Sequence, residues 1–291
     1  MEPRPPPPAR RPLPWHVVLL VLVPLLASWA TVSGYVEADP AYRVSGLGRV
    51  ERPGPLPGGV SLDPNDGMTT QALGHFAAES WLAGRVPWWN PFGGVGLPLA
   101  GEGQNPALFL PFALLLHFGR GPLLLLLALQ VCAGLFTHAL LRRLGLHPLA
   151  ALGGAALYQL NGTFAWFGDQ PMQPIAFLPL LFLGVERACQ AARDAGRVGG
   201  AFCVAAGLGL MLYAAFPETA YLIALPAGLL ALARMAELPP RLWRVYALSV
   251  GGGTVAGLLI ALPYLVPFLE MMALGSTGPG HEDGGFGLIH L

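Results

Sequence analysis

Apolar residues run along this chain in long blocks separated by shorter polar stretches. A helix needs about twenty mostly apolar residues to cross the hydrocarbon core of a bilayer. Seven blocks reach or approach that length, and they cover residues 15–35, 123–141, 149–167, 172–185, 201–216, 219–233 and 246–268. The pattern predicts an all-α fold, a polytopic bundle of about seven transmembrane helices.

A large polar segment follows the first block and carries a second pattern. Its first part, 37–65, is rich in proline and glycine and has no periodicity. After Asp66, apolar residues return at spacings of three and four up to Gly84, which predicts an amphipathic helix. Its apolar face holds Met68, Leu73, Phe76, Ala77 and Trp81, and its polar face holds Gln71, His75 and Glu79. We expect this helix to lie in the membrane interface with its aromatic side chains toward lipid.

The arginines indicate which side of the membrane each loop faces, because cytoplasmic loops are enriched in basic residues. If the short apolar stretch 107–118 lies at the outer interface or re-enters, eleven arginines fall on the side of the N-terminus and five on the other. This predicts a cytoplasmic tail 1–14, a transmembrane domain 15–275 with an outward first loop 36–122, and a polar tail 276–291. The first block is expected to be an uncleaved anchor, because the residues after it match a signal-peptide cleavage site poorly.

Composition agrees with a membrane protein. Apolar residues make up 54% of the chain and charged residues 11%, with a mean hydropathy of +0.56, a balance that would not keep a soluble domain in solution. All 16 basic residues are arginine, which with the many Ala, Gly and Pro residues is typical of a GC-rich bacterial genome. The net charge is zero, so nucleic acid is not an expected partner. Gly251, Gly252 and Gly253 lie inside an apolar block and predict close helix packing.

Short motifs follow one another in a fixed order. The outward loop carries Asp66, then Gly84-Arg85-Val86-Pro87, Trp89-Asn90-Pro91-Phe92-Gly93-Gly94 and Glu102-Gly103-Gln104, and the later blocks carry Leu160-Asn161-Gly162-Thr163, Phe216-Pro217-Glu218-Thr219 and Pro263-Tyr264-Leu265-Val266-Pro267. In residues and order they resemble the YfhO-type bacterial membrane proteins, which look like GT-C glycosyltransferases that use lipid-linked sugars. The resemblance covers residues 15–275. Members of that family usually run well past twice this length, so the chain is expected to be an N-terminal portion.

The resemblance implies a function and a set of site residues. It implies transfer of a sugar from a polyprenyl-phosphate donor to an envelope glycan, lipid or protein acceptor, at the outer face of the bacterial inner membrane. Asp66 would be the catalytic acid or base, with Glu102 as the second acid, although family members more often carry aspartate there. Both carboxylates could hold a divalent metal such as Mg²⁺ or Mn²⁺. The substrate-binding residues would be Arg85, His75, Trp89, Asn90 and Gln104.

Each of these residues also has an ordinary structural interpretation. Asp66 could cap the predicted helix, Glu102 could be a solvated loop acid, and Arg85 could anchor the loop to lipid headgroups. A tryptophan such as Trp89 could belong to an interfacial aromatic belt.

Two other functions stay open. The first is a transporter or flippase for a lipid-linked envelope component, which would need polar side chains facing one another at mid-membrane depth. The apolar blocks offer Gln130, His138 and Gln159, which look isolated from one another in the sequence. The second is a non-catalytic fragment of a transferase.

Overall fold

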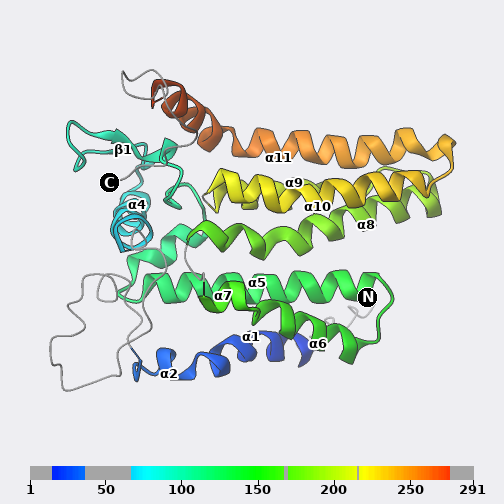
Figure 1. Ribbon diagram of the computed structural model, residues 1–291, viewed down its shortest axis with the longest axis horizontal. Helices are drawn as coiled ribbons and strands as arrows, with labels where there is room; N and C mark the ends of the chain where they lie inside the picture. Colours follow the sequence, from blue (N-terminus) through cyan, green and yellow to red (C-terminus); the bar gives the residue numbers. More distant parts are fainter. Residues whose placement is uncertain (1–14, 37–66, 167–169, 215, 276–291) are drawn as a thin grey trace, which may run out of the picture.

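The computed structural model describes residues 15–36, 67–166, 170–214 and 216–275, and these residues are mostly helical. Helices lie side by side along one axis, and a layer of short elements crosses one end of the bundle (Figure 1). The bundle contains α1 Trp15–Ala27, α2 Trp29–Val32, α5 Gly121–Arg143, α6 Pro148–Gln159, α7 Gly162–Trp166, η6 Gln170–Phe177, α8 Leu178–Ala195, α9 Ala201–Tyr213, α10 Pro217–Ala236 and α11 Pro240–Gly275. The end layer contains η3 Met68–Leu73, α4 Gly74–Leu82, β1 Trp89–Asn90, β2 Leu97–Pro98, η4 Leu99–Gly101 and η5 Phe112–His117.

Within the described ranges, four helices are long and apolar enough to cross a membrane. They are Gly121–Arg143, Met172–Ala195, Pro217–Ala236 and Pro240–Ala273, and they correspond to four of the seven predicted spans. The prediction of a mostly helical protein with helices long and apolar enough to cross a membrane is confirmed for these four. Two further predicted spans appear as the shorter apolar helices α1 and α9, with 13 residues each.

The predicted span 149–167 is divided into α6 and α7, and Asn161 is the physical reason. Its side-chain nitrogen donates to the Tyr158 carbonyl near the end of α6 (2.7 Å), and its Oδ1 accepts from the Phe164 amide in α7 (3.2 Å). An asparagine side chain can thus satisfy one helix end and the next helix start, groups that an uninterrupted helix would pair internally.

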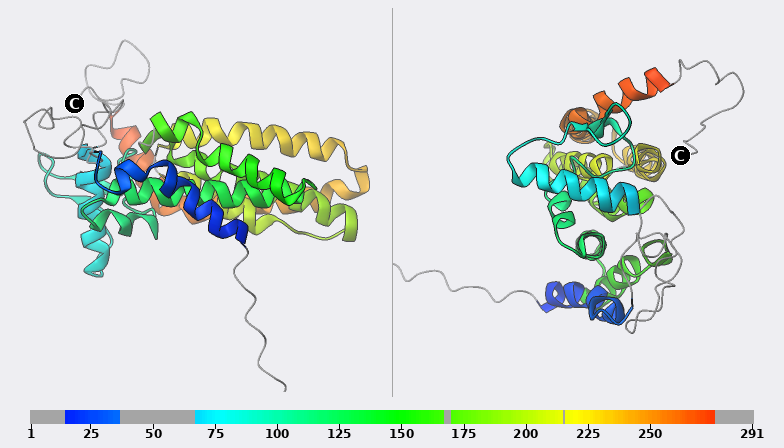
Figure 2. Two further views of the ribbon diagram at one scale, coloured as in Figure 1. Left: turned by 90° about the horizontal axis from the view of Figure 1, so that it is seen from below. Right: turned by 90° about the vertical axis from the view of Figure 1, so that its left-hand side faces the viewer.

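The end layer contains the helix that the sequence pattern predicts after Asp66. A π-helical turn, η3, leads into α4, and α4 runs across the end of the bundle (Figure 2, right). Its aromatic residues contact other loop residues, where we expected contact with lipid. The Trp81 indole donates to the Ala107 carbonyl (2.7 Å), and Phe76 packs edge-to-face on Phe92 with ring centroids 5.4 Å apart. The irregular backbone around Ala107 offers an acceptor that lipid cannot supply to the indole.

The apolar stretch 107–118 does not form one of the four long helices. It forms η5 within the end layer, with Ala107 and Phe109 completely buried. This placement agrees with the expectation that 107–118 stays on one side.

Close packing at the predicted glycine run is confirmed at one of its three positions. A Cβ at Gly253 of α11 would lie 2.7 Å from the Ala201 carbonyl of α9, while nothing lies within 4 Å of the corresponding position at Gly251 or Gly252. Gly253 thus lets α9 approach the α11 backbone, as small residues do between helices in membranes.

A single hydrogen bond joins α1 to α6 inside the apolar bundle. Pro24 of α1 has no amide hydrogen, so the Leu20 carbonyl four residues earlier lacks its helical donor. The Gln159 side-chain nitrogen, at the end of α6, donates to that carbonyl (3.3 Å). A Cβ at Gly134 of α5 would overlap Gln159 Oε1, so glycine at this position lets the amide reach between the helices.

We predict that Gly134→Ala displaces the Gln159 amide and lowers the free energy of unfolding by about 1–3 kcal/mol, the usual cost of overpacking. The measurement is thermal or denaturant unfolding in detergent. Gly153→Ala is the matched control, because nothing lies within 4 Å of a Cβ at Gly153 and alanine favours helix there. Equal stability of the two variants would contradict the role given to Gly134.

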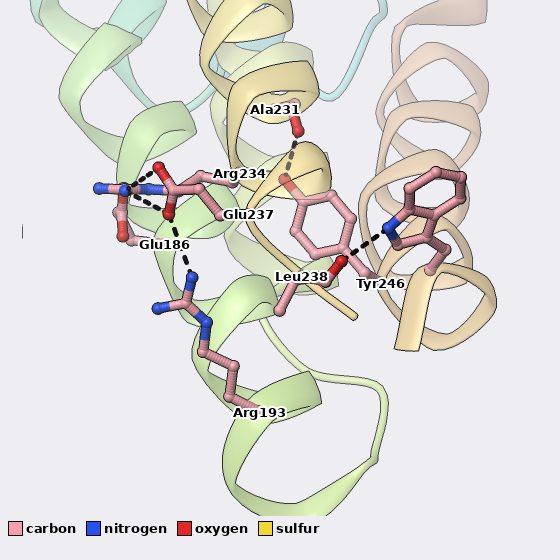
Figure 3. Close-up of polar contacts among 8 residues, drawn as sticks. Glu186, Arg193, Ala231, Arg234, Glu237, Leu238 and Tyr246 are labelled. Carbon is pink, nitrogen blue, oxygen red and sulfur yellow. Dashed lines mark hydrogen bonds and ion pairs between the residues drawn. The ribbon is translucent and has the colours of Figure 1, made fainter. Parts of the chain in front are cut away.

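The opposite end of the bundle carries an ion-pair cluster between α8 and the end of α10 (Figure 3). The Arg234 guanidinium donates to Glu186 (2.6 Å) and to Glu237 (3.0 Å), and Arg193 donates to Glu237 (3.1 Å). The side chains of Arg234 and Glu186 are 27% and 13% exposed, whereas those of Arg193 and Glu237 are each 47% exposed. Burial makes the Arg234–Glu186 pair the stronger tie between the two helices.

We predict that Arg234→Met destabilises the folded protein by about 1–3 kcal/mol, because it leaves the Glu186 carboxylate buried without its partner. Arg193→Met removes an exposed partner of the same cluster and is expected to change stability little. Unfolding of the two variants in the same detergent compares them directly. A larger loss in Arg193→Met would overturn this ranking.

Candidate functional site

The loop Gly101-Glu102-Gly103 lies against α11 and the start of α10, at the end of the bundle that carries α4. A Cβ at Gly101 would lie 2.6 Å from the Pro267 carbonyl of α11, and a Cβ at Gly103 would lie 3.0 Å from the Phe268 ring. The Gly103 carbonyl accepts from the Phe216 amide just before α10 (2.8 Å). The two glycines therefore allow the loop to press against both helices, with Glu102 held between them.

Asn105 fixes the Glu102 carboxylate. The Asn105 side-chain nitrogen donates to Glu102 Oε2 (2.6 Å) and to the Leu99 carbonyl (3.0 Å), and its Oδ1 accepts from the Ala107 amide (2.9 Å). The Gln104 amide also donates to Oε2 (3.3 Å). Glu102 Oε1 makes no hydrogen bond to a described residue, so one carboxylate oxygen is held and the other can meet a ligand.

Burial raises the pKa of Glu102 above its ordinary value of 4.5, because the ionised carboxylate loses hydration in this loop. The hydrogen bonds from Asn105 and the Gln104 amide oppose this shift, since they stabilise the ionised form. The side chain is still partly exposed. A carboxyl group with a raised pKa that solvent can reach is suited to accept and release a proton.

Aromatic residues of α9 and α11 form a wall beside this carboxylate. Tyr264 lies close enough to Glu102 to experience its charge, and its ring stacks on Phe268 with centroids 6.0 Å apart. Tyr213 donates to the Ile260 carbonyl (2.6 Å). The Tyr264 hydroxyl is buried and makes no hydrogen bond within the described part of the chain, so it is a free polar group beside Glu102.

Phe216 adds a second unusual feature to the same site. It is the only described non-glycine residue with a positive φ, at 61°, a conformation that L-residues with large side chains rarely adopt. Its amide donates to Gly103 and its carbonyl accepts from Ala220 in the first turn of α10. Backbone strain of this kind persists where surrounding contacts enforce it, and it is common at functional sites.

The structure places the other predicted site residues at separate points of the end layer. Asp66 lies outside the described residues. Arg85 is exposed just after α4. Trp89 is 52% exposed and its indole covers Gly96, whereas Asn90 is buried and its Oδ1 accepts from the Phe92 amide to form the hairpin turn. Of the predicted substrate-binding residues, only Gln104 shares the hydrogen-bond network of Glu102.

His75 belongs to a second polar cluster on the face of α4 that meets η5. Its Nδ1 donates to the Leu116 carbonyl (3.0 Å), and its ring stacks on His117. His117 in turn forms a hydrogen bond with Glu79. Among the described residues, no group of three or more His, Cys, Asp or Glu side chains is arranged to hold a metal ion. Glu102 offers one free oxygen, so the described residues do not complete a ligand set for Mg²⁺ or Mn²⁺.

Sequence reasoning missed three residues of this site: Asn105, Tyr264 and Phe216. Tyr264 and Phe216 stand in motifs that resemble the YfhO-type pattern, and Asn105 directly follows the motif Glu102-Gly103-Gln104, but none of the three had been given a role. The run Pro263-Tyr264-Leu265-Val266-Pro267 contains the available signal, because prolines inside a membrane helix mark a place where backbone groups turn to other partners.

Comparison of the chain with protein-family models, with curated proteins and with solved structures gives no match. The resemblance to YfhO-type proteins therefore rests on the residues of the chain alone.

We predict that Glu102 makes the free energy of unfolding fall as the pH rises from its ordinary pKa of 4.5 through its raised folded pKa. Between its ordinary pKa and its raised folded pKa, the folded protein keeps the Glu102 proton while the unfolded chain has lost it. The contribution is therefore complete below the unfolded pKa and is lost as the pH passes the folded pKa. Glu102→Gln, compared with wild type by unfolding across this range, should remove that part of the slope. Parallel curves for the two proteins would show that burial does not perturb this carboxyl group.

Proposed function

We propose that this protein is a membrane glycosyltransferase of the GT-C type that moves a sugar from a polyprenyl-phosphate donor to a cell-envelope acceptor, with Glu102 as its base. One observation supports it above the others. A carboxylate with a raised pKa, held by Asn105 through one oxygen and without a hydrogen bond from any described residue at the other, lies at the end of a bundle that contains four helices able to cross a membrane. A lipid-linked sugar would present its headgroup at that level, while its chain stays among the helices.

In the proposed reaction, Glu102 Oε1 accepts the proton of the acceptor hydroxyl as that oxygen attacks the anomeric carbon. The bond from the anomeric carbon to the phosphate oxygen breaks, and the phosphate leaves with the electron pair. The configuration at the anomeric carbon inverts. Tyr264 offers its free hydroxyl to the bound sugar, and Asn105 keeps the carboxylate oriented.

Further residues complete the proposal. Arg85, exposed on the same layer, would meet the phosphate bidentately, and Trp89 would stack on a sugar ring. His75, Asn90 and Gln104 would line the route of the substrate. Asp66 would be the second acid, and a divalent metal held by Asp66 beside Glu102 would help to neutralise the charge of the leaving phosphate.

The proposed placement follows from the arginines. The ends of α5, α8 and α10 and the start of α11 lie together at the end of the bundle opposite α4 and β1 (Figure 1). The helix ends and loops there carry Arg142, Arg143, Arg193, Arg197 and Arg241. With this end cytoplasmic, Glu102 would face the outside of a bacterial inner membrane, and α1, α6–α7 and α9 would complete seven crossings.

We predict that Glu102→Gln lowers the rate of sugar transfer about 10²–10⁴-fold, the usual contribution of a positioned base. The assay uses the purified, detergent-solubilised chain with polyprenyl-phosphate sugars, with and without Mg²⁺ or Mn²⁺. Glu79→Gln removes an exposed acid of the same layer and is the matched control. Asp66→Asn is expected to abolish transfer as well, if Asp66 is the second acid.

Retained transfer in Glu102→Gln would exclude Glu102 as the base. Binding of the donor without transfer by the wild-type chain would instead favour a carrier of lipid-linked sugar or an incomplete transferase.

A further inference from the structure

Four polar side chains that look isolated in the sequence lie where α1, α5 and α6 pack against one another. Gln130, Thr137 and His138 are spaced along one face of α5 at intervals of seven and one residues, with Gly134 between them. Gln159 of α6 reaches Gly134 on this face and donates to α1. We call these four residues the polar seam. It extends from Gln130 to His138 of α5, eight steps along the helix or about 12 Å at 1.5 Å per residue.

Each member of the polar seam is buried and has a polar atom without a partner. The residues are 5%, 7%, 8% and 0% exposed in the order Gln130, Thr137, His138 and Gln159. Gln130 Oε1, Thr137 Oγ1, His138 Nε2 and Gln159 Oε1 make no hydrogen bond to any described residue. The orientation of Gln159 is fixed, since the Leu20 carbonyl can only accept and must face the amide nitrogen. Unpaired polar atoms are costly in an apolar interior, so four of them in one seam call for a ligand.

The chemistry of the surrounding helices identifies that ligand as water. Three of the four atoms can accept hydrogen bonds in the geometry described, and the Thr137 hydroxyl can donate or accept. A cation would also suit acceptors, but α1, α5 and α6 contain no Asp or Glu to balance its charge. Arg142, one turn beyond His138, would repel it. Water needs no counter-charge and bridges two to four polar partners.

The polar seam also has a natural entrance. His138 stacks on His16 of α1, with ring centroids 4.6 Å apart, and His16 is partly exposed. Both lie toward the end of the bundle where α5 finishes at Arg142 and Arg143. Gln130 lies thirteen residues before Arg143, about 20 Å along the helix.

We propose that the polar seam is a water-filled inlet that opens at the arginine-bearing end of α5 and reaches at least to Gln130, near the middle of the spanning helix. The inlet is independent of the Glu102 site, which lies at the other end of the bundle. It gives the protein a hydrated path through about half of the membrane thickness, the kind of polar pathway that marks ion and substrate routes in membrane proteins.

Cysteine accessibility tests the inlet in proteoliposomes. In a background with Cys132, Cys189 and Cys203 replaced by alanine, single cysteines are placed at Thr137 and Gln130 in the seam. Leu129→Cys is the matched control, because Leu129 lies one residue from Gln130 at the same depth, is 1% exposed and packs in the apolar core. Leu146→Cys, in the exposed loop after α5, reports which side is open to a membrane-impermeant charged thiol reagent.

We expect Thr137→Cys and Gln130→Cys to react about tenfold faster than Leu129→Cys, because the reactive thiolate forms only where water reaches it. Reaction should occur from the side that labels Leu146→Cys. Thr137→Cys is nearly isosteric, so this variant should keep the fold even if Gln130→Cys does not. Equal reactivity of Thr137→Cys and Leu129→Cys, or labelling of Thr137→Cys from the opposite side alone, would overturn the proposal.

Discussion

The arrangement of this bundle depends on one constraint, that every backbone polar group inside an apolar interior needs a partner. Pro24 removes the donor for the Leu20 carbonyl, and Gln159 supplies a replacement from a helix distant in sequence. That bond requires Gly134 on the third helix, because any side chain there would occupy the place of the amide. A single proline thus determines a polar residue on α6 and a small residue on α5, and the three helices can pack only in this register.

Prolines also affect the packing of α11, where a loop and not a side chain meets the helix backbone. Pro263 and Pro267 lie inside α11, and the irregular loop around Glu102 packs against the Pro267 carbonyl. The glycines of this loop therefore suit its contact with α11, because the loop backbone can approach the helix only at positions that carry no side chain. Glu102 is the one long side chain of that loop segment, and burial of the segment is what raises its pKa.

Much of this organisation could be predicted from the sequence. Apolar periodicity predicted the four long helices and the helix over 74–82, because both depend on local spacing of residues. It failed at 149–167, where the average over the block hides the capping action of one asparagine, Asn161. Glu102 was a candidate from its motif, but its neighbour Tyr264 was not, because their proximity depends on how α11 packs against the loop. A pair of residues so distant in sequence cannot be placed by local patterns.

The polar residues inside the apolar helices also could not be placed from local patterns. Gln130, His138 and Gln159 read as isolated when each is seen in its own apolar block. Gln159 becomes their neighbour only because α6 returns antiparallel to α5 and Gly134 allows close approach. Three-dimensional packing thus turns scattered polar residues into one continuous polar surface, while the helix faces around it stay apolar. The buried polar side chains of α5 and α6 therefore lie at a place distinct from the carboxylate on which the transferase proposal depends.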